Sequence, residues 1–274
     1  VYGTPGEEGG ENGSAKGSFV REGFFRDCNA ALCVHPSSRG HRLSAETIAC
    51  APVSIEFFGK PAHAASSPEK GINALDALIL TYNGLNALRQ HVTPDVRIHG
   101  IITHGGTEPN IVPEYARALF YLRAARAPTL DNLYQRTLDI VAGASAMTGA
   151  RGEMKPSQNR VDNMLVTPSF DQVYARHLLA CGETLNEEPA GSIGSSDVGN
   201  VSQVIPTIQP WISITDEEVT PHSEAFRDAA CSEKGLRSIE LGARLLARTA
   251  LDLILDPGLL AAIKAEHAVV VAAQ

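Results

Sequence analysis

The sequence predicts an α/β layer that is interrupted by an inserted βαββαβ domain, and three observations predict this fold class. Residues 1–50 alternate short apolar runs with glycine-rich turns, the strand, loop, helix, strand rhythm of an α/β layer. Residues 51–159 follow the order strand, helix, strand, strand, helix, strand, which is the ferredoxin-like plan. Residues 160–274 then return to helices around an apolar stretch. We therefore expect one domain from residues 1–50 and 160–274, and a second from residues 51–159.

The first segment begins as though inside a strand, because the apolar pair Val1-Tyr2 runs directly into a glycine turn. A strand that begins at residue 1 predicts a sheet that is incomplete at its N-terminus. A short helix is expected around Ser18 to Gly23, and an apolar strand from Ala30 to Val34 that ends at His35-Pro36.

The inserted domain has the most regular pattern. Its two expected helices carry apolar residues near the helical period, and the second stops at Gly149. The expected helices are Gly71–Val92 and Leu130–Met147, and the expected strands are Val53–Phe58, Val96–Thr103, Tyr115–Arg123 and Gly152–Pro156.

The last segment predicts two helices on either side of loops and an apolar stretch. The expected helices are Pro168–Cys181, which ends at Gly182, and Glu233–Leu255, with a Gly/Ser-rich loop at 186–200 and an apolar stretch at 201–214.

Composition excludes several classes of protein. No apolar run approaches the roughly 18 residues that span a bilayer, so no membrane partner is expected. The net charge of −8 repels phosphate backbones, so no nucleic-acid partner is expected. Five cysteines without a C-x-x-C pair are typical of free thiols, which indicates a cytoplasmic protein.

Four residues could carry metal chemistry. Glu7 and Glu8 are adjacent carboxylates on a glycine-rich turn, and a bound cation would relieve their repulsion, although a solvated acidic turn is the ordinary alternative. His35 ends an apolar strand and His222 follows the acidic loop 216–218; each alone is an ordinary hydrogen-bonded histidine. Together, a carboxylate and two imidazoles form a ligand set that zinc, manganese or cobalt accepts.

Competing signatures are missing from the sequence. It contains no H-E-x-x-H, no Walker loop, no G-x-S-x-G elbow and no G-x-G-x-x-G. The S-x-x-K match at Ser67–Lys70 lacks its partner motifs, so a serine hydrolase is weakly supported.

Several ordered motifs resemble the landmarks of metallopeptidase family 20, in the branch of aminobenzoyl-glutamate hydrolase and the β-alanyl-lysine type dipeptidase. The resemblance runs from residue 1 to about residue 268. It implies a zinc-peptidase domain with a parallel or mixed sheet, interrupted by a lid domain that also makes a homodimer. The motifs are Gly3-Thr-Pro-Gly-Glu-Glu-Gly-Gly10, Val34-His35-Pro36, Gly59-Lys-Pro-Ala-His63-Ala-Ala, Gly71-Ile-Asn-Ala-Leu-Asp76, Gly105-Gly-Thr-Glu-Pro-Asn110-Ile-Val-Pro113 and Gly194-Ser-Ser-Asp-Val-Gly-Asn-Val201.

The resemblance implies roles for the candidate metal residues. Glu7 would be the general base, and Glu8, His35 and His222 would be metal ligands of a site for two Zn²⁺ ions, with Mn or Co as alternatives. Glu7 would take a proton from a metal-bound water and pass it to the leaving amine, so that an amide in a dipeptide or an N-acyl or N-aroyl amino acid is hydrolysed.

The resemblance also implies substrate contacts. His63 would reach the partner subunit's active site and steady the oxyanion, and a surface histidine beside a helix is the alternative. Asn110 and Arg123 would hold polar groups or the carboxylate of the substrate, although a strand-end charge explains Arg123 about as well. Gly194 and Ser195 would let the substrate backbone lie close, and a plain turn is the alternative.

The match departs from the family at the upstream Cys-Gly-His-Asp type motif, which supplies the first metal ligands and which this sequence does not contain. The expected metal site is therefore incomplete. Two hypotheses follow: a metal-dependent amidohydrolase of which this is the larger part, or a catalytically inactive truncated homologue that acts as a dimerising or binding protein.

Overall fold

The computed structural model describes residues 1–10, 13–188 and 194–274, and the chain divides into two compact units. Unit 1 comprises Val1–Ser18 and Ile48–Asn163, and unit 2 comprises Phe19–Thr47 and Met164–Gln274. Residues 1–18 therefore group with unit 1, whereas the sequence-based division assigns them to the flanking domain. Parts of two expected loops, residues 11–12 and 189–193, lie outside the described residues.

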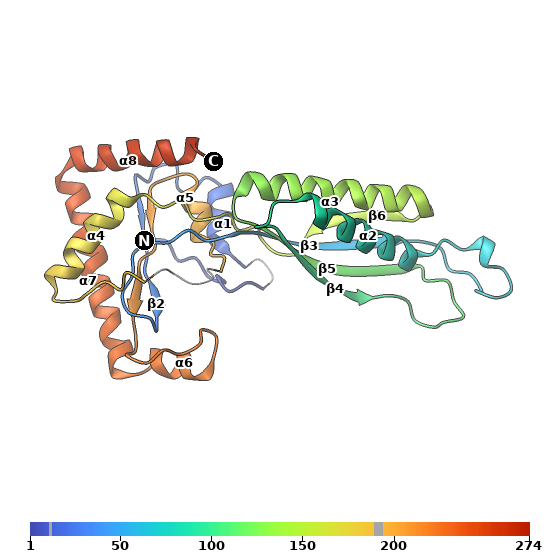
Figure 1. Ribbon diagram of the computed structural model, residues 1–274, viewed down its shortest axis with the longest axis horizontal. Helices are drawn as coiled ribbons and strands as arrows, with labels where there is room; N and C mark the ends of the chain where they lie inside the picture. The colour runs from blue at the N-terminus through green and yellow to red at the C-terminus, as the bar shows by residue number, and fades with distance from the viewer. Residues whose placement is uncertain (11–12, 189–193) are drawn as a thin grey trace. The chain divides into compact units, whose positions relative to one another are not determined.

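Unit 1 is a four-stranded antiparallel sheet with two helices packed on it (Figure 1). The strands lie in the order β4-β5-β3-β6, and the elements follow the chain as β3-α2-β4-β5-α3-β6, so the expected βαββαβ plan is confirmed. The elements are β3 (Ala49–Phe58), η1 (Pro68–Lys70), α2 (Ala74–Leu88), η2 (Arg89–His91), β4 (Arg97–His104), β5 (Tyr115–Ala124), α3 (Ala127–Thr148) and β6 (Arg151–Pro156).

Alternation along the strands builds the core of unit 1. Phe120 and Leu122 of β5 are buried, while the residues between them are half-buried, because successive side chains point to opposite faces. Leu78 of α2 and Leu130 of α3 belong to the same apolar cluster. The helix α2 begins later than expected because the Asn73 side chain caps the backbone N–H groups of the first turn.

Unit 2 contains two short parallel sheets surrounded by helices (Figure 1). The strands are β1 (Ala31–Leu32) with β7 (Thr207–Ile208), and β2 (His35–Ser37) with β8 (Trp211–Ser213). The helices are α4 (Pro168–Ala180), α5 (Val198–Ser202), α6 (Glu224–Ala230), α7 (Glu233–Leu255) and α8 (Pro257–Ala272), and α1 (Ala15–Arg21) crosses the border between the units. The expected α/β class is thus confirmed.

Three sequence-based expectations are wrong in detail. Val1-Tyr2 forms no strand. Of the expected strand Ala30–Val34, only Ala31–Leu32 is a strand (β1), and β2 begins beyond it at His35. The helices α5, α6 and α8 are not among the expected elements. For α8 the signal is present in the sequence, because Asp256 caps the Leu259 N–H and Pro257 occupies the first helical position.

The core of unit 2 lies between α4, α7 and α8. Phe170 and Tyr174 of α4 are fully buried and cluster with Leu245 of α7 and Ile263 of α8. Apolar side chains also lie exposed on α7, among them Leu236, Ile239, Leu251 and Ile254. In the part of the chain that the structure describes, no helix is both long and apolar enough to cross a membrane.

One carboxyl group lies inside unit 2. Asp171 is nearly inaccessible, and its Oδ1 accepts hydrogen bonds from the Ser44 amide at 3.0 Å and the Ser44 hydroxyl at 2.7 Å. Its Oδ2 has no hydrogen-bond partner among the described residues. Burial raises the pKa of Asp171 from its usual 3.8 to about 6, because desolvation outweighs the two bonds from Ser44.

The buried carboxyl group predicts a pH-dependent stability. Because the folded-state pKa lies above the unfolded value, the folded state binds the proton more tightly, and this contribution to stability is lost as the pH rises from 3.8 to about 6. We expect Asp171→Asn to gain stability relative to the wild type by on the order of 3 kcal/mol between about pH 4 and about pH 7. Urea unfolding followed by fluorescence of Trp211, the one tryptophan, measures unit 2. If the difference in unfolding free energy between Asp171→Asn and the wild type does not change with pH, the raised pKa of Asp171 is contradicted.

Candidate functional site

Glycine residues build the turn that carries Glu7 and Glu8. Gly6 and Gly9 have φ angles of 71° and 102°, which are left-handed conformations that favour glycine. The carbonyl oxygen of Gly6 accepts from the Gly9 amide at 3.2 Å and from the Ser14 amide at 2.5 Å. Glu7 is half-buried and Glu8 is exposed. The backbone therefore closes on itself and presents two neighbouring carboxylates.

A close backbone approach within this turn requires glycine at residue 13. A Cβ atom there would lie 2.4 Å from the carbonyl carbon of Gly9. The Gly13 carbonyl accepts from the Asn159 side chain at 2.8 Å, and the same Asn159 nitrogen lies 2.8 Å from the Ser18 hydroxyl. The turn is thus fastened to the segment that follows β6.

The structure brings His63 and Asn110 together in unit 1. The backbone of His63 bridges Ile111, and the Ala64 amide donates to the Asn110 carbonyl at 2.9 Å. The His63 Nδ1 accepts from the amides of Ala65 and Ser66 at 3.3 and 3.2 Å. Because Nδ1 accepts, the proton of the neutral ring lies on Nε2, and the exposed imidazole can donate a hydrogen bond to an anionic oxygen.

Arg123 lies away from that pair. It lies near the end of β5, eight residues beyond Tyr115, the first residue of that strand. At a rise of about 3.3 Å per residue, roughly 26 Å separates Arg123 from Tyr115. Its guanidinium lies over the ring of Tyr121, 5.5 Å from the centroid. Arg123 and Asn110 therefore do not share one binding site within a single unit 1.

His35 is held in one tautomer at the start of β2. Its Nδ1 lies 2.8 Å from the carbonyl oxygen of Pro36, and because a carbonyl only accepts, Nδ1 carries the proton. The ring also packs on Trp211, with centroids 4.2 Å apart. This arrangement leaves the Nε2 lone pair as the coordinating atom, as metal-binding histidines require.

His222 lies in the loop that follows β8 and has a φ of 60°, a left-handed conformation that is uncommon outside glycine. The same loop is tied to the segment after β2, because Ser38 donates to the Val219 carbonyl at 2.8 Å and Arg39 pairs with Glu218 at 2.5 Å. Gly194 and Ser195 precede α5, and a Cβ at Gly194 would meet open space.

The expected metal ligands are divided between the two units. Glu8 belongs to unit 1, whereas His35 and His222 belong to unit 2. Across residues 1–10, 13–188 and 194–274, no three His, Cys, Asp or Glu side chains lie close enough to hold one ion. The assignment of these three residues as ligands stays a prediction.

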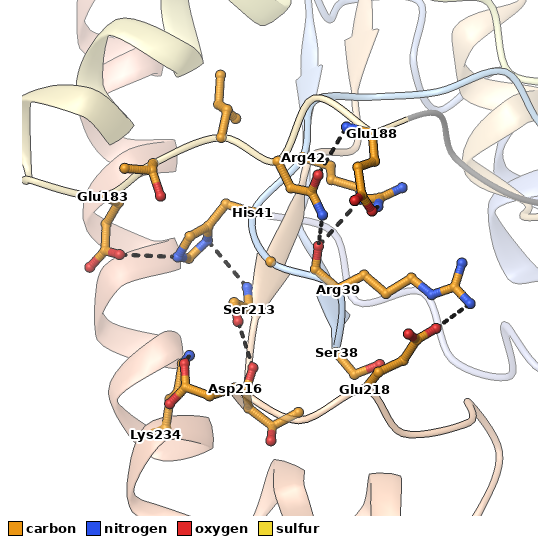
Figure 2. A pocket seen from close by; sticks show the side chains of 15 residues that line it. Ser38, Arg39, His41, Arg42, Glu183, Glu188, Ser213, Asp216, Glu218 and Lys234 are labelled. Atoms are coloured by element: carbon orange, nitrogen blue, oxygen red, sulfur yellow. Dashed lines mark hydrogen bonds and ion pairs between the residues drawn. The ribbon is translucent and has the colours of Figure 1, made fainter.

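Sequence reasoning missed a polar cavity in unit 2. The cavity has a volume of about 550 Å³ and is lined by the segment after β2, the segment 183–188, the end of β8 and its following loop, and Lys234 of α7 (Figure 2). We call it the Arg42 cavity. The sequence offers one signal for this cavity, the charged segment from Arg39 to Arg42, but an ordinary surface loop can have the same composition.

Ion pairs surround the Arg42 cavity. Figure 2 shows the His41 ring between Glu183 and the end of β8: Nδ1 accepts from the Ser213 amide at 3.2 Å, and Nε2 lies 3.2 Å from Glu183. Burial lowers the pKa of His41 despite the neighbouring Glu183. Lys234 pairs with Asp216, and Arg42 faces Glu188.

Comparisons with known proteins relate the whole chain to hydrolases. Residues 51–145 match the family of the peptidase dimerisation domain. The chain is 34% identical over 269 residues to the Xaa-Arg dipeptidase of Mus musculus, covering 97% of this chain and 61% of that protein. It is 29% identical over 321 residues to a p-aminobenzoyl-glutamate hydrolase component of Escherichia coli, covering 97% of this chain and 66% of that protein.

A solved structure shares the fold. The aminobenzoyl-glutamate utilization protein from Klebsiella pneumoniae superposes with a TM-score of 0.65 at 20% identity, covering 85% of this chain and 57% of that one. The resemblance expected from the motifs is thereby confirmed, and the chain spans 61% of the length of its mouse relative.

The geometry of the glycine turn predicts that one added methyl group at residue 13 disrupts the turn. In Gly13→Ala, the new Cβ would overlap the Gly9 carbonyl, so the turn must open. We expect the hydrogen-exchange protection of the Ser14 amide to fall by about tenfold or more. Gly3→Ala is the matched control, because a Cβ at Gly3 meets nothing within 4 Å. Equal protection in the two variants would show that the turn does not need glycine at 13.

Proposed function

Because the chain is a relative of the amidohydrolases of metallopeptidase family 20 and contains a peptidase dimerisation domain, we propose that it acts in the hydrolysis of an amide bond to an amino acid. The observation that carries the proposal is the 34% identity to a dipeptidase over nearly the whole chain. Both relatives are named for substrates in which an acyl group is joined to an amino acid. A dipeptide or an N-acyl or N-aroyl amino acid is therefore the proposed substrate class.

Glu7 is the proposed general base. It lies on a turn whose backbone closes tightly, so a substrate carbonyl could approach the carboxylate without side-chain obstruction from the glycines. A carboxylate in that position would accept a proton from the attacking water and return it to the departing amine. The proposal for His63 follows from its Nε2–H, which would donate to the oxyanion as the carbonyl carbon becomes tetrahedral.

The proposal includes a divalent metal because the candidate ligands offer donor atoms that suit one. His35 has its Nδ1 proton engaged by a carbonyl, which leaves Nε2 for a metal, and Glu8 and His222 would supply further ligands. Zn²⁺ suits such donors, and Mn or Co are alternatives. We assign no reaction step to the metal, because the described residues hold no three-ligand group.

The match to a peptidase dimerisation domain also fits a second candidate, a catalytically inactive homologue that binds or dimerises. The two candidates differ in one measurable property, which is turnover of an amide by the 274-residue chain. Asn110, Arg123, Gly194 and Ser195 stay proposed substrate contacts under the first candidate and have no defined role under the second.

Substitution of the two glutamates separates base from ligand. Glu7→Gln removes the basic oxygen at constant size, and we expect turnover of an Xaa-Arg dipeptide or of p-aminobenzoyl-glutamate to fall by about 1,000-fold while bound metal is retained. Glu8→Ala and His222→Ala should instead lose bound metal. Mass analysis of metal content beside a turnover assay measures both effects.

Two outcomes would contradict the first candidate. Unchanged turnover in Glu7→Gln would contradict the assignment of Glu7 as the general base. A wild-type chain that neither turns over these amides nor binds a divalent metal would favour the inactive homologue. Glu22→Gln, an exposed glutamate paired with Arg21, is a suitable control substitution.

We also propose that unit 1 forms a homodimer through α2 and the neighbouring edge strand β4. The support is the match to a peptidase dimerisation domain and the position of β4 at the edge of the sheet, where its backbone groups can pair with another chain. The exposed side chains of Ile101 and Ile102 add apolar surface at that edge.

A charge placed on this edge tests the dimer. We expect Ile101→Lys to raise the dimer dissociation constant by at least about tenfold, because a buried ammonium at the interface would lack a partner. Ile239→Lys on α7 is the matched control, since Ile239 is similarly exposed but lies in unit 2. Sedimentation that finds a strict monomer for the wild type at micromolar concentration would overturn the interface.

A further inference from the structure

The Arg42 cavity has an asymmetric lining. In each of its ion pairs the basic side chain is less exposed than the carboxylate. The Arg42 side chain is 11% exposed whereas its partner Glu188 is 81% exposed, and His41 is 9% exposed beside Glu183 at 42%. Lys234 likewise is less exposed than Asp216. An entering molecule can therefore displace Glu188 into water more readily than it can displace the largely buried Arg42 side chain.

The guanidinium of Arg42 has spare hydrogen-bonding capacity. An arginine side chain carries five N–H donors in a rigid fork. Among the described residues, Arg42 makes one long side-chain hydrogen bond, from Nε to the Arg39 carbonyl at 3.4 Å. Its contact with Glu188 is 3.9 Å, which is an ion pair beyond hydrogen-bond distance. A largely buried charge with so few close acceptors is costly unless a further acceptor completes it.

Hydrogen bonds hold the main chain of Arg42 in place. The Arg42 amide donates to the Trp211 carbonyl at 2.9 Å, and the Trp211 amide donates back to the Arg42 carbonyl at 2.8 Å. The Asn186 side chain donates to the Arg39 carbonyl at 2.7 Å, which ties the segment 183–188 to the same wall. The cavity is thus preformed, and its volume of about 550 Å³ lies in the range of small-molecule sites.

We propose that the Arg42 cavity binds a small carboxylate-bearing molecule, whose carboxylate takes the place of Glu188 and forms a bidentate pair with the Arg42 guanidinium. The planar fork matches two carboxylate oxygens, and such paired bonds are shorter and stronger than the 3.9 Å contact that they replace. Lys234, from α7, supplies a second positive charge in the lining for a dicarboxylate. The proposal concerns unit 2 alone and does not rest on amide hydrolysis.

Calorimetric titration of the 274-residue chain with sodium succinate tests the site, with methylguanidinium chloride and inorganic phosphate as comparison probes. We expect succinate to bind in about the millimolar range or tighter, and Arg42→Gln to weaken it by about tenfold or more. Glu188→Gln should strengthen binding by about threefold, because it removes the competing carboxylate without touching a buried group. Arg244→Gln, an exposed arginine paired with Glu240 on α7, should leave the affinity unchanged.

The variant Glu188→Gln keeps the test decisive if Arg42→Gln fails to fold. The proposal is overturned if wild-type succinate binding is absent up to about 50 mM, or if Glu188→Gln binds succinate no more tightly than the wild type. Binding of methylguanidinium in place of succinate would overturn it too, by showing that the exposed carboxylates select a cation. If phosphate binds as tightly as succinate, the proposed carboxylate site is also overturned, because the cavity then binds anions in general.

Discussion

The parallel pairing of β2 with β8 is the constraint on which the chemistry of unit 2 depends. It joins segments about 175 positions apart and sets His35 opposite Trp211. Several of the candidate residues of unit 2 follow these strands: His41 and Arg42 come after β2, and the loop with Glu218 and His222 comes after β8. Because each strand has only three residues, the pair cannot stand alone, and the buried contacts of α4, α7 and α8 must hold it.

Unit 1 achieves its geometry by different means. Its sheet is long, its core is continuous, and the loops that carry His63 and Asn110 are fastened to each other by backbone hydrogen bonds beyond the strand ends. Main-chain bonds position a side chain more firmly than exposed ion pairs, which contribute little in water. Unit 1 therefore presents its candidate residues on a support fastened by main-chain hydrogen bonds.

Periodicity in the sequence was enough to predict unit 1, because its helices and strands are long and one face of each is buried. The sequence was less informative for unit 2, where β1, β7 and β8 have two or three residues and no period can be counted. Residue types on a glycine-rich turn, at a strand end and beside an acidic loop supplied Glu7, His35 and His222 as candidates, and motif resemblance supplied their roles. It could not supply Arg42 or Glu188, because the difference in exposure between the two partners arises only when segments 39–42 and 183–188 meet in space.

His35, His41 and His63, whose Nδ1 atoms contact backbone groups, show how the backbone decides what an imidazole can do. In His35 the Nδ1 meets a carbonyl, so it must carry the proton, and Nε2 is left as a lone-pair donor suited to a metal. In His63 and His41 the Nδ1 meets amide N–H groups, so it must accept, and Nε2 becomes a hydrogen-bond donor, which in His41 points at Glu183. The same side chain is thus suited to bind a metal in one loop and to donate to an oxyanion or a carboxylate in another. A motif specifies only that a histidine is present, whereas the partner of Nδ1, set by the local turn, selects between these chemistries.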